Sequence, residues 1–451
     1  MPELKEAFKR VAVIGAAGKM GSGISLIILQ EMARSEAEAS GQSGTGEYRL
    51  ALIDSNESGL IGLKRYLRSN LTKYAEKQIN LLRRYFEKNA ALISNEEMVK
   101  YFVDGALDIV STDTELSHAK SANLVFEAIV EDVESKKDLF CNLKKNALST
   151  QFYFTNTSSI PISVLDEAAQ LDHRIIGFHF YNPPAIQKLL EIISPTSIDP
   201  SLEKMALEIA KRLKKTVVRS HDVAGFIGNG HFIRELHFAC KQANQLAQEK
   251  QISLAETIYL INFVTQNYLL RPMGIFQVAD YVGLDVCHNI MQIMRTYLQD
   301  PDLQDNLIEQ FLASGIKGGQ NSDGSPKNGI FSYENRAIHG VYSLEKKAYI
   351  PIKSFEDKIG IQKSVGDLSW NSLQNDPDKK EKIKKHLATV CISKTSGALI
   401  AQAFLNRSWD IANGLVTEHV ADSLEDVNTV LKNGFFHLEG VAEVAIFRPT
   451  A

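Results

Sequence analysis

The first half of the chain alternates short apolar runs with longer amphipathic stretches. The apolar runs are typical of buried strands, and the amphipathic stretches are typical of helices that cover them. Residues 201–215 illustrate the second kind, because one helix face there carries Leu202, Met205, Ile209 and Leu213. Strands that alternate with helices predict an α/β fold with a doubly wound parallel sheet. We expect strands at 10–14, 49–54, 109–112, 122–132, 151–159, 173–183 and 216–220, and helices at about 18–34, 57–90, 134–147 and 201–215.

A Gly-rich turn joins the first expected strand to the first expected helix. Gly15, Gly18 and Gly21 follow an apolar run and precede the apolar helical residues 24–32. Strand, glycine turn and helix together are typical of a Rossmann-type dinucleotide site, where phosphates bind at the helix N-terminus. The spacing is G-x-x-G-x-x-G rather than G-x-G-x-x-G, so Ala17 or Gly18 has to allow the close approach of a pyrophosphate. The alternative is an ordinary Gly-rich turn.

Asp54 ends the second expected strand. An acidic residue there accepts hydrogen bonds from the adenosine ribose and repels a 2′-phosphate, which favours NAD over NADP. Asp54 lies further from Gly21 than the usual distance of about 20 residues. We attribute the extra length to the polar stretch 35–48, which we expect to be a surface loop. An alternative role for Asp54 is to cap the helix that follows it.

The pattern changes near residue 220, because long helical stretches follow without intervening strands. We therefore expect an α/β Rossmann-type sheet followed by all-α C-terminal domains. The Ser-x-x-Glu pattern at 253–256 predicts a capping box, and 423–426 approximates a second one, which suggests that a helical unit occurs twice. The expected parts are a dinucleotide-binding domain at 1–220, a helical domain at 221–345, a linker at 346–385 and a second, partial helical domain at 386–451.

Composition is that of an ordinary globular protein and argues against several classes of function. Of the 451 residues, 44% are hydrophobic and 23% are charged, and the formal net charge is −4. This balance does not favour binding to nucleic acid or to an anionic membrane surface. The four cysteines lie far apart, without the spacing of a metal site or a disulfide framework. We expect a reducing compartment and, because the N-terminal residues lack an apolar segment, a cytoplasmic location.

Three polar clusters stand at the ends of expected strands. Glu127 and Glu131 end one strand, and residues 156–159 end the next. His179 lies near the end of a third strand, and Glu191 follows it after a Pro-marked turn. A dehydrogenase that oxidises an alcohol needs a base for the hydroxyl proton, and a histidine paired with a carboxylate serves near neutral pH. The alternative is a core histidine whose hydrogen bonds are satisfied.

Residues 57–90 predict one or two exposed helices with several basic side chains. A solvated basic face is the simpler interpretation. A substrate that carries phosphate would also find a wall of positive charge there. The basic side chains are Lys64, Arg65, Arg68, Lys73 and Lys77.

Several motifs, taken in order, resemble those of the 3-hydroxyacyl-CoA dehydrogenase family of fatty-acid β-oxidation. The resemblance covers about residues 9–335, and the tail from about 386 is similar, less specifically, to the second helical copy of longer members. The motifs are the glycine turn with Lys19-Met20-Gly21, FEAIVED followed by Lys136, TNTSS, GFHFYNPPAIQKLLEII, AGFIGN, RPMGIFQVADYVGLDV and GIFSY.

The resemblance implies NAD as the cofactor and oxidation of an L-3-hydroxyacyl-CoA to the 3-oxoacyl-CoA. It implies that His179 is the catalytic base and that Glu191 is its carboxylate partner. Ser158 would hydrogen-bond the 3-oxygen of the substrate, and Asn229 would contact the substrate or the histidine from the second domain. Lys77 falls where the family has a basic contact to coenzyme A. The implied cofactor-binding residues are Gly15, Ala17, Gly18, Lys19, Met20, Gly21, Asp54, Glu131 and Lys136.

The sequence departs from the family pattern at several positions. The glycine turn is one residue longer, Gly230 stands where the family commonly has Arg, and Met-Gly-Ile replaces Met-Gly-Pro. Two other hypotheses therefore stay open: a dehydrogenase of a 3-hydroxy acid without coenzyme A, and an NAD-binding protein without catalysis. We expect a monomer or a homodimer, since a second helical copy could supply the dimer surface internally, and we expect no metal, nucleic-acid or membrane partner.

Overall fold

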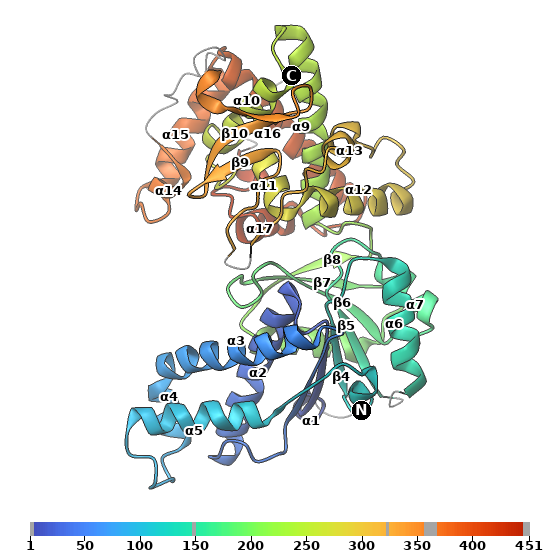
Figure 1. Cartoon of the computed structure of the whole chain (residues 1–451), viewed down its shortest axis with the longest axis vertical. Coiled ribbons are helices and arrows are strands. Elements are labelled where there is room, and N and C mark those ends of the chain that lie inside the picture. The colour runs from blue at the N-terminus through green and yellow to red at the C-terminus, as the bar shows by residue number, and fades with distance from the viewer. Residues whose placement is uncertain (1–3, 147–149, 322–323, 356–367, 445–451) are drawn as a thin grey trace. The chain divides into compact units, whose positions relative to one another are not determined.

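The computed structural model describes residues 4–146, 150–321, 324–355 and 368–444. The chain divides into two units, Met1–Asp222 and Val223–Ala451, each with a hydrophobic core of its own (Figure 1). Parts of the expected segments, namely Ala147 of a helix, 356–367 of the linker and 445–451 of the last domain, lie outside the described residues.

The first unit is built on an eight-stranded sheet with the order β3-β2-β1-β4-β5-β6-β7-β8. Neighbouring strands are parallel except β6 and β7, so β7 and β8 run opposite to the others. The order reverses at β1, which is where ligands bind in open α/β sheets. The predicted fold class is confirmed. The strands are β1 Arg10–Ile14, β2 Arg49–Ile53, β3 Val110–Asp113, β4 Leu124–Glu127, β5 Phe152–Thr155, β6 Ile175–Phe180, β7 Leu189–Ser194 and β8 Thr216–His221.

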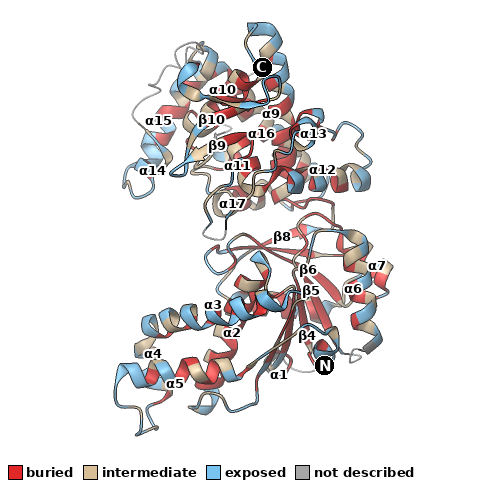
Figure 2. Cartoon of the chain, in the orientation of Figure 1, coloured by how far each residue is buried: buried red, intermediate tan, exposed pale blue. Residues whose placement is uncertain are grey.

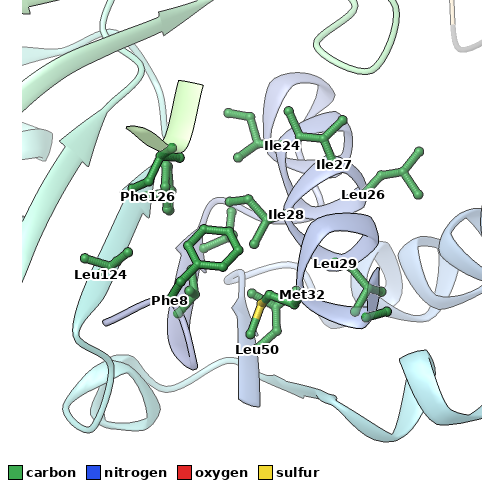
Figure 3. Packing of buried hydrophobic residues seen from close by; sticks show 14 of the residues in the cluster. Phe8, Ile24, Leu26, Ile27, Ile28, Leu29, Met32, Leu50, Leu124 and Phe126 are labelled. Atoms are coloured by element: carbon green, nitrogen blue, oxygen red, sulfur yellow. The ribbon is translucent and has the colours of Figure 1, made fainter. Parts of the chain in front are cut away.

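Helices cover both faces of this sheet. Successive side chains of a strand point to opposite sides, so both faces carry apolar side chains that the helices bury. In Figure 3, Met32 and Ile28 of α2 lie close to Leu50 of β2 and to Phe8. On the other face, Phe140 of α6 packs edge-on against the ring of Tyr153 in β5. The helices are α1 Leu4–Ala7, α2 Lys19–Ser40, α3 Glu57–Lys77, α4 Ile79–Tyr85, α5 Asn95–Asp108, α6 Val133–Asn146, α7 Ile162–Ala169 and α8 Pro200–Arg212, with a 3-10 turn at Leu116–Ala119.

The first long helix extends beyond its expected end. Residues 35–40 of the predicted surface loop belong to α2, and only 41–48 connect it to β2. The reason is Glu36, which is buried and accepts hydrogen bonds from the backbone N–H groups of Gly44 and Thr45. The Glu36 side chain holds the connection against the helix, although the composition of residues 35–48 is typical of a loop.

The second unit is mainly helical and also contains a three-stranded antiparallel sheet, which the hydrophobic pattern did not indicate. Within the range predicted as a linker, β11, α14 and the start of α15 are regular elements. α16 packs against α9 and α10, so the tail shares the core of this unit. The elements are α9 Gly228–Lys250, α10 Leu254–Asn267, α11 Ile275–Val282, α12 Leu284–Leu298, α13 Asn306–Ala313, β9 Phe331–Glu334, β10 Ala337–Ser343, β11 Ala348–Pro351, a 3-10 turn Ile352–Ser354, α14 Trp370–Leu373, α15 Lys379–Ile392, α16 Ser396–Thr417, α17 Leu424–Gly434 and α18 Val441–Val444.

The sequence correctly predicted the N-terminal caps of α10 and α17. Ser253 and Glu256 form the expected capping box of α10, and the Ser423 side chain accepts a hydrogen bond from the N–H of Asp426 in α17. Figure 2 shows β4, β5 and β6 of the large sheet as buried and much of α3 as exposed. Among the described helices, none alone has the length and apolar character to cross a membrane; α15 and α16 meet that criterion only together, across a bend of 108°.

Asp280 joins α11 to the small sheet. Its buried carboxylate accepts hydrogen bonds from the N–H groups of Ile330 at 2.6 Å and Phe331 at 2.8 Å, and from the Tyr333 hydroxyl at 3.0 Å. Burial outweighs these three donors and raises the pKa of Asp280 to about 7. The carboxyl group therefore binds a proton more readily in the folded chain than in the unfolded chain.

We expect Asp280→Asn to destabilise the protein more at pH 5 than at pH 8. A carboxyl group with a raised pKa contributes stability that is lost as the pH rises from about 3.9, its unfolded value, to about 7, its folded value. Asn does not titrate, so the difference in free energy of unfolding should narrow by up to about 1.4 kcal/mol per pH unit within this window. Urea denaturation at several pH values measures it. A difference that widens with pH would contradict the raised pKa.

Candidate active site

The glycine turn lies at the carboxyl end of β1. Gly15 has a φ of +74°, which favours glycine, and the N–H groups of Gly15 and Ala16 donate to the Ile53 carbonyl at 2.9 and 3.1 Å. A Cβ at Gly21 would overlap the Gly15 carbonyl, so only glycine lets α2 approach the turn this closely. Gly18 is the N-cap of α2 and, as a glycine, has no side chain to bond the first N–H groups of that helix. The tight turn and the uncapped helix N-terminus suit the pyrophosphate of a dinucleotide.

Asp54 ties this turn to the end of β2. One carboxylate oxygen accepts a hydrogen bond from the N–H of Ala17 at 2.9 Å, and the other accepts one from the N–H of Asn56 at 2.9 Å. Asn56 is the N-cap of α3, so the capping role considered for Asp54 belongs to Asn56. Asp54 instead lies beside the turn, as a ribose contact requires. Lys19 is exposed at the first position of α2, and Met20 packs against the core.

The Glu131 carboxylate organises the turn that follows β5. One of its oxygens accepts hydrogen bonds from the Thr157 hydroxyl at 2.7 Å and from the N–H groups of Ser158 at 2.8 Å and Ser159 at 2.9 Å. The hydroxyls of both serines also donate to it, at 3.3 and 2.8 Å. Burial raises the pKa of Glu131, but Lys136 and these donors together hold it below its usual value. A charged carboxylate therefore fixes the backbone that carries Ser158.

Lys136 is buried between two carboxylates. Its ammonium group lies 2.6 Å from Glu127 and 3.7 Å from Glu131, and only 1% of the residue is exposed. The Thr155 hydroxyl and the N–H of Ile129 also donate to Glu127. Lys136 is buried here, whereas Glu131 keeps part of its side chain exposed, and the predicted place of both residues at the NAD site stays a prediction. Lys136 supports the ends of β4 and β5 by neutralising the charge between them.

The antiparallel strands β6 and β7 bring His179 and Glu191 together. The two residues are register partners, and His179 Nδ1 lies 2.9 Å from Glu191 Oε2. Glu191 is fully buried, and His179 keeps 8% of its surface exposed. An imidazole whose Nδ1 donates to a buried carboxylate has Nε2 as its basic nitrogen. The end of β5 is fixed to this strand, since the Asn156 side chain accepts a hydrogen bond from the N–H of Phe180 at 2.8 Å.

Tyr181 belongs to this cluster, and sequence reasoning missed it. Its hydroxyl donates to Glu191 Oε2 at 2.7 Å, and the centres of the Tyr181 and His179 rings are 4.8 Å apart. Burial, together with Glu191, raises the pKa of Tyr181 well above its usual value, so the hydroxyl keeps its proton. The available signal was spacing, because residues two apart in extended chain share a face. An aromatic residue in an apolar strand is more often part of the core.

Two predicted site residues belong to other elements. Asn229 is the second residue of α9 and lies in the second unit, and Lys77 is the exposed last residue of α3. The structure therefore brings His179 and Glu191 into contact and places Ser158 in the turn after β5, the strand beside that of His179. The contacts predicted for Asn229 and Lys77 stay predictions. Among the described residues, no group of His, Cys, Asp or Glu could hold a metal ion.

Two family models match the chain in sequence order. The model of the 3-hydroxyacyl-CoA dehydrogenase NAD-binding domain matches residues 52–223, and that of the C-terminal domain matches 225–327. A mitochondrial hydroxyacyl-coenzyme A dehydrogenase from Sus scrofa is 32% identical over 279 residues, which cover 61% of this chain and 77% of that protein. The chain belongs to the 3-hydroxyacyl-CoA dehydrogenase family. Members of this family are NAD-dependent oxidoreductases.

Other relatives of this dehydrogenase family cover more of the chain. A probable 3-hydroxybutyryl-CoA dehydrogenase from Bacillus subtilis is 29% identical over 332 residues, which cover 73% of this chain and 98% of that protein. The crystal structure of 3-hydroxybutyryl-CoA dehydrogenase from Escherichia coli K12 shares the fold, with a TM-score of 0.63, 20% identity, and coverage of 96% of this chain and 90% of that one. The NAD-domain match begins at residue 52, so the glycine turn with its unusual spacing lies outside it.

Lys136→Met should lower the free energy of unfolding by about 3–5 kcal/mol, because Glu127 would stay buried without its counter-charge. Lys137→Met is the matched control, since Lys137 pairs with Glu134 at 2.9 Å on the surface. Surface salt bridges contribute less than about 1 kcal/mol. Urea denaturation of both variants measures the two effects. Wild-type stability of Lys136→Met would show that the buried ion pair does not hold these strand ends.

Proposed function

We propose that this dehydrogenase oxidises an L-3-hydroxyacyl-CoA to the 3-oxoacyl-CoA with NAD, and catalyses the reverse reduction. Family membership and the names of its relatives support a hydroxyacyl-CoA substrate. The observation that carries the proposal is the contact between His179 and the buried Glu191 at the carboxyl end of β6. That end of the sheet is where the ligands of such folds bind.

His179 is the base of the proposed reaction. Its Nδ1 proton is held by Glu191, so Nε2 takes the proton of the substrate 3-hydroxyl during oxidation. NAD, when bound, supplies the acceptor for the hydride that leaves carbon 3. The buried carboxylate stabilises the imidazolium that forms and fixes the orientation of the ring. In the reverse direction the imidazolium returns the proton to the 3-oxygen.

Other residues orient the substrate and the cofactor in this proposal. Ser158, whose backbone N–H is held by Glu131, donates a hydrogen bond from its hydroxyl to the 3-oxygen in place of the long 3.3 Å bond to Glu131. Asn229 is kept as the predicted substrate contact from the helical unit. The glycine turn binds the pyrophosphate through the N-terminus of α2, and Asp54 beside it accepts hydrogen bonds from the adenosine ribose. Lys77 attracts a phosphate of coenzyme A.

His179→Ala should lower kcat for the reduction of acetoacetyl-CoA by NADH about 10²–10⁴-fold, the usual contribution of general acid–base catalysis. His173→Ala is the matched control, because His173 Nδ1 also lies 2.9 Å from a carboxylate, that of Asp166, but its side chain is 56% exposed. We expect wild-type kcat from this control. The loss of NADH absorbance measures turnover, and circular dichroism checks folding. Near-full activity of a folded His179→Ala protein would exclude the role given to this residue.

The same assay with free acetoacetate tests the coenzyme A part of the proposal. The exposed Lys73 and Lys77 on α3 favour the thioester. We therefore expect a much higher kcat/KM for acetoacetyl-CoA than for acetoacetate. Equal values would indicate an enzyme of free 3-hydroxy acids. NADH binding without turnover of either compound would indicate a protein that binds the cofactor without this catalysis.

A further inference from the structure

The Glu191 oxygen that faces His179 also accepts a hydrogen bond from the Tyr181 hydroxyl. We propose that Tyr181 is a positioning residue that sets the orientation and the effective charge of the carboxylate that Glu191 presents to His179. Tyr181 acts through Glu191 in this account and does not touch the reacting atoms. The inference rests on the function proposed above.

The geometry supports a role for the phenol hydroxyl in orienting the carboxylate. Glu191 Oε2 lies 2.9 Å from His179 Nδ1 and 2.7 Å from the Tyr181 hydroxyl, so both groups meet the same oxygen. The Tyr181 ring lies beside the imidazole, tilted by 39° to it. A carboxylate with one such donor can rotate about its last side-chain bond. The second donor keeps Oε2 directed towards Nδ1.

The charge of the site supports a second effect of the same hydroxyl. Because Tyr181 keeps its proton, it is a neutral donor to a charged acceptor. A hydrogen bond of this kind stabilises the carboxylate, and it weakens the attraction between that carboxylate and a proton on the neighbouring imidazole. Tyr181 therefore makes it easier for the imidazolium of His179 to release its proton.

Three other charged groups near β6 have contacts of their own elsewhere. Lys215 lies 5.4 Å from the centre of the Phe180 ring, which alternates with His179 and so points to the other side of the strand. Burial lowers the pKa of Lys215 to about 8. Glu131 and Lys136 are engaged with each other and with the ends of β4 and β5.

The test is Tyr181→Phe, which removes the hydroxyl and keeps the ring. In the oxidation direction, we expect the acid limb of the kcat/KM profile to move to higher pH by about 0.5–1 unit, because the carboxylate then holds the imidazole proton more strongly. We expect kcat to fall about 3–10-fold, since the orientation of Glu191 is less defined, while KM stays within about twofold of wild type. A role confined to stability would lower the melting temperature and leave the acid limb in place.

Tyr153→Phe is the matched control. Tyr153 is a fully buried tyrosine of β5 in the same sheet, and its hydroxyl has no hydrogen-bond partner among the described residues. Removing that hydroxyl breaks no hydrogen bond to the residues that the structure describes. We expect an unchanged pH profile and an unchanged kcat from this variant.

A readout without turnover separates this inference from the proposed function. The imidazole resonances of isotope-labelled protein can be titrated by NMR, with His179→Ala to assign one signal among the 11 histidines. We expect the titration midpoint of His179 to be higher in Tyr181→Phe than in wild type. A raised midpoint in an enzyme that turns over no substrate would overturn the proposed function and keep the inference. If the enzyme is active but Tyr181→Phe has the same NMR titration midpoint and the same acid limb as wild type, the inference is wrong and the proposed function stands.

Discussion

The antiparallel pairing of β6 with β7 is the constraint on which the site depends. In the rest of the large sheet the neighbouring strands are parallel, and a residue on the next parallel strand would come back only after a crossover connection. The direct return after β6 instead places Glu191 opposite His179 in the register. A slip by one residue would turn the carboxylate to the other face of the sheet. Such a slip would take the fully buried Glu191 carboxylate away from His179 and Tyr181, and separating a buried charge from its partners is costly.

Buried and half-buried carboxylates hold the strand ends around this pair. Asp54 holds the glycine turn, Glu131 holds the turn that carries Ser158, and Glu127 pairs with Lys136 beneath them. Each accepts bonds from backbone N–H groups, hydroxyls or an ammonium group, as buried charge requires. Such a framework fixes catalytic groups before substrate binds, and preorganised polar groups of this kind contribute strongly to catalysis.

The sequence predicted the elements that have a periodic pattern and missed contacts that only the folded chain creates. The alternation of apolar runs identified seven of the eight strands of the large sheet but missed β7, and the polar residues at and after the strand ends identified His179 and Glu191. Lys136 follows an acidic segment, so its sequence context is typical of an exposed lysine. Its burial was missed because the turn into α6 brings it to Glu127. Tyr181 was missed because its partner lies on the next strand. The last helical residues of α2, 35–40, were expected to be a loop because their sequence is polar, but the buried Glu36 stabilises the helix there.

The most direct test of the central claim is the pH dependence of kcat for acetoacetyl-CoA reduction in Glu191→Gln beside wild type. The amide oxygen can accept the same hydrogen bonds, so the substitution removes the charge and keeps the shape. If the carboxylate stabilises the imidazolium, kcat falls at least about 10²-fold, and the activity that remains is lost at lower pH than in wild type, because the ring gives up its proton more easily. Wild-type kcat with an unchanged pH profile would contradict the account.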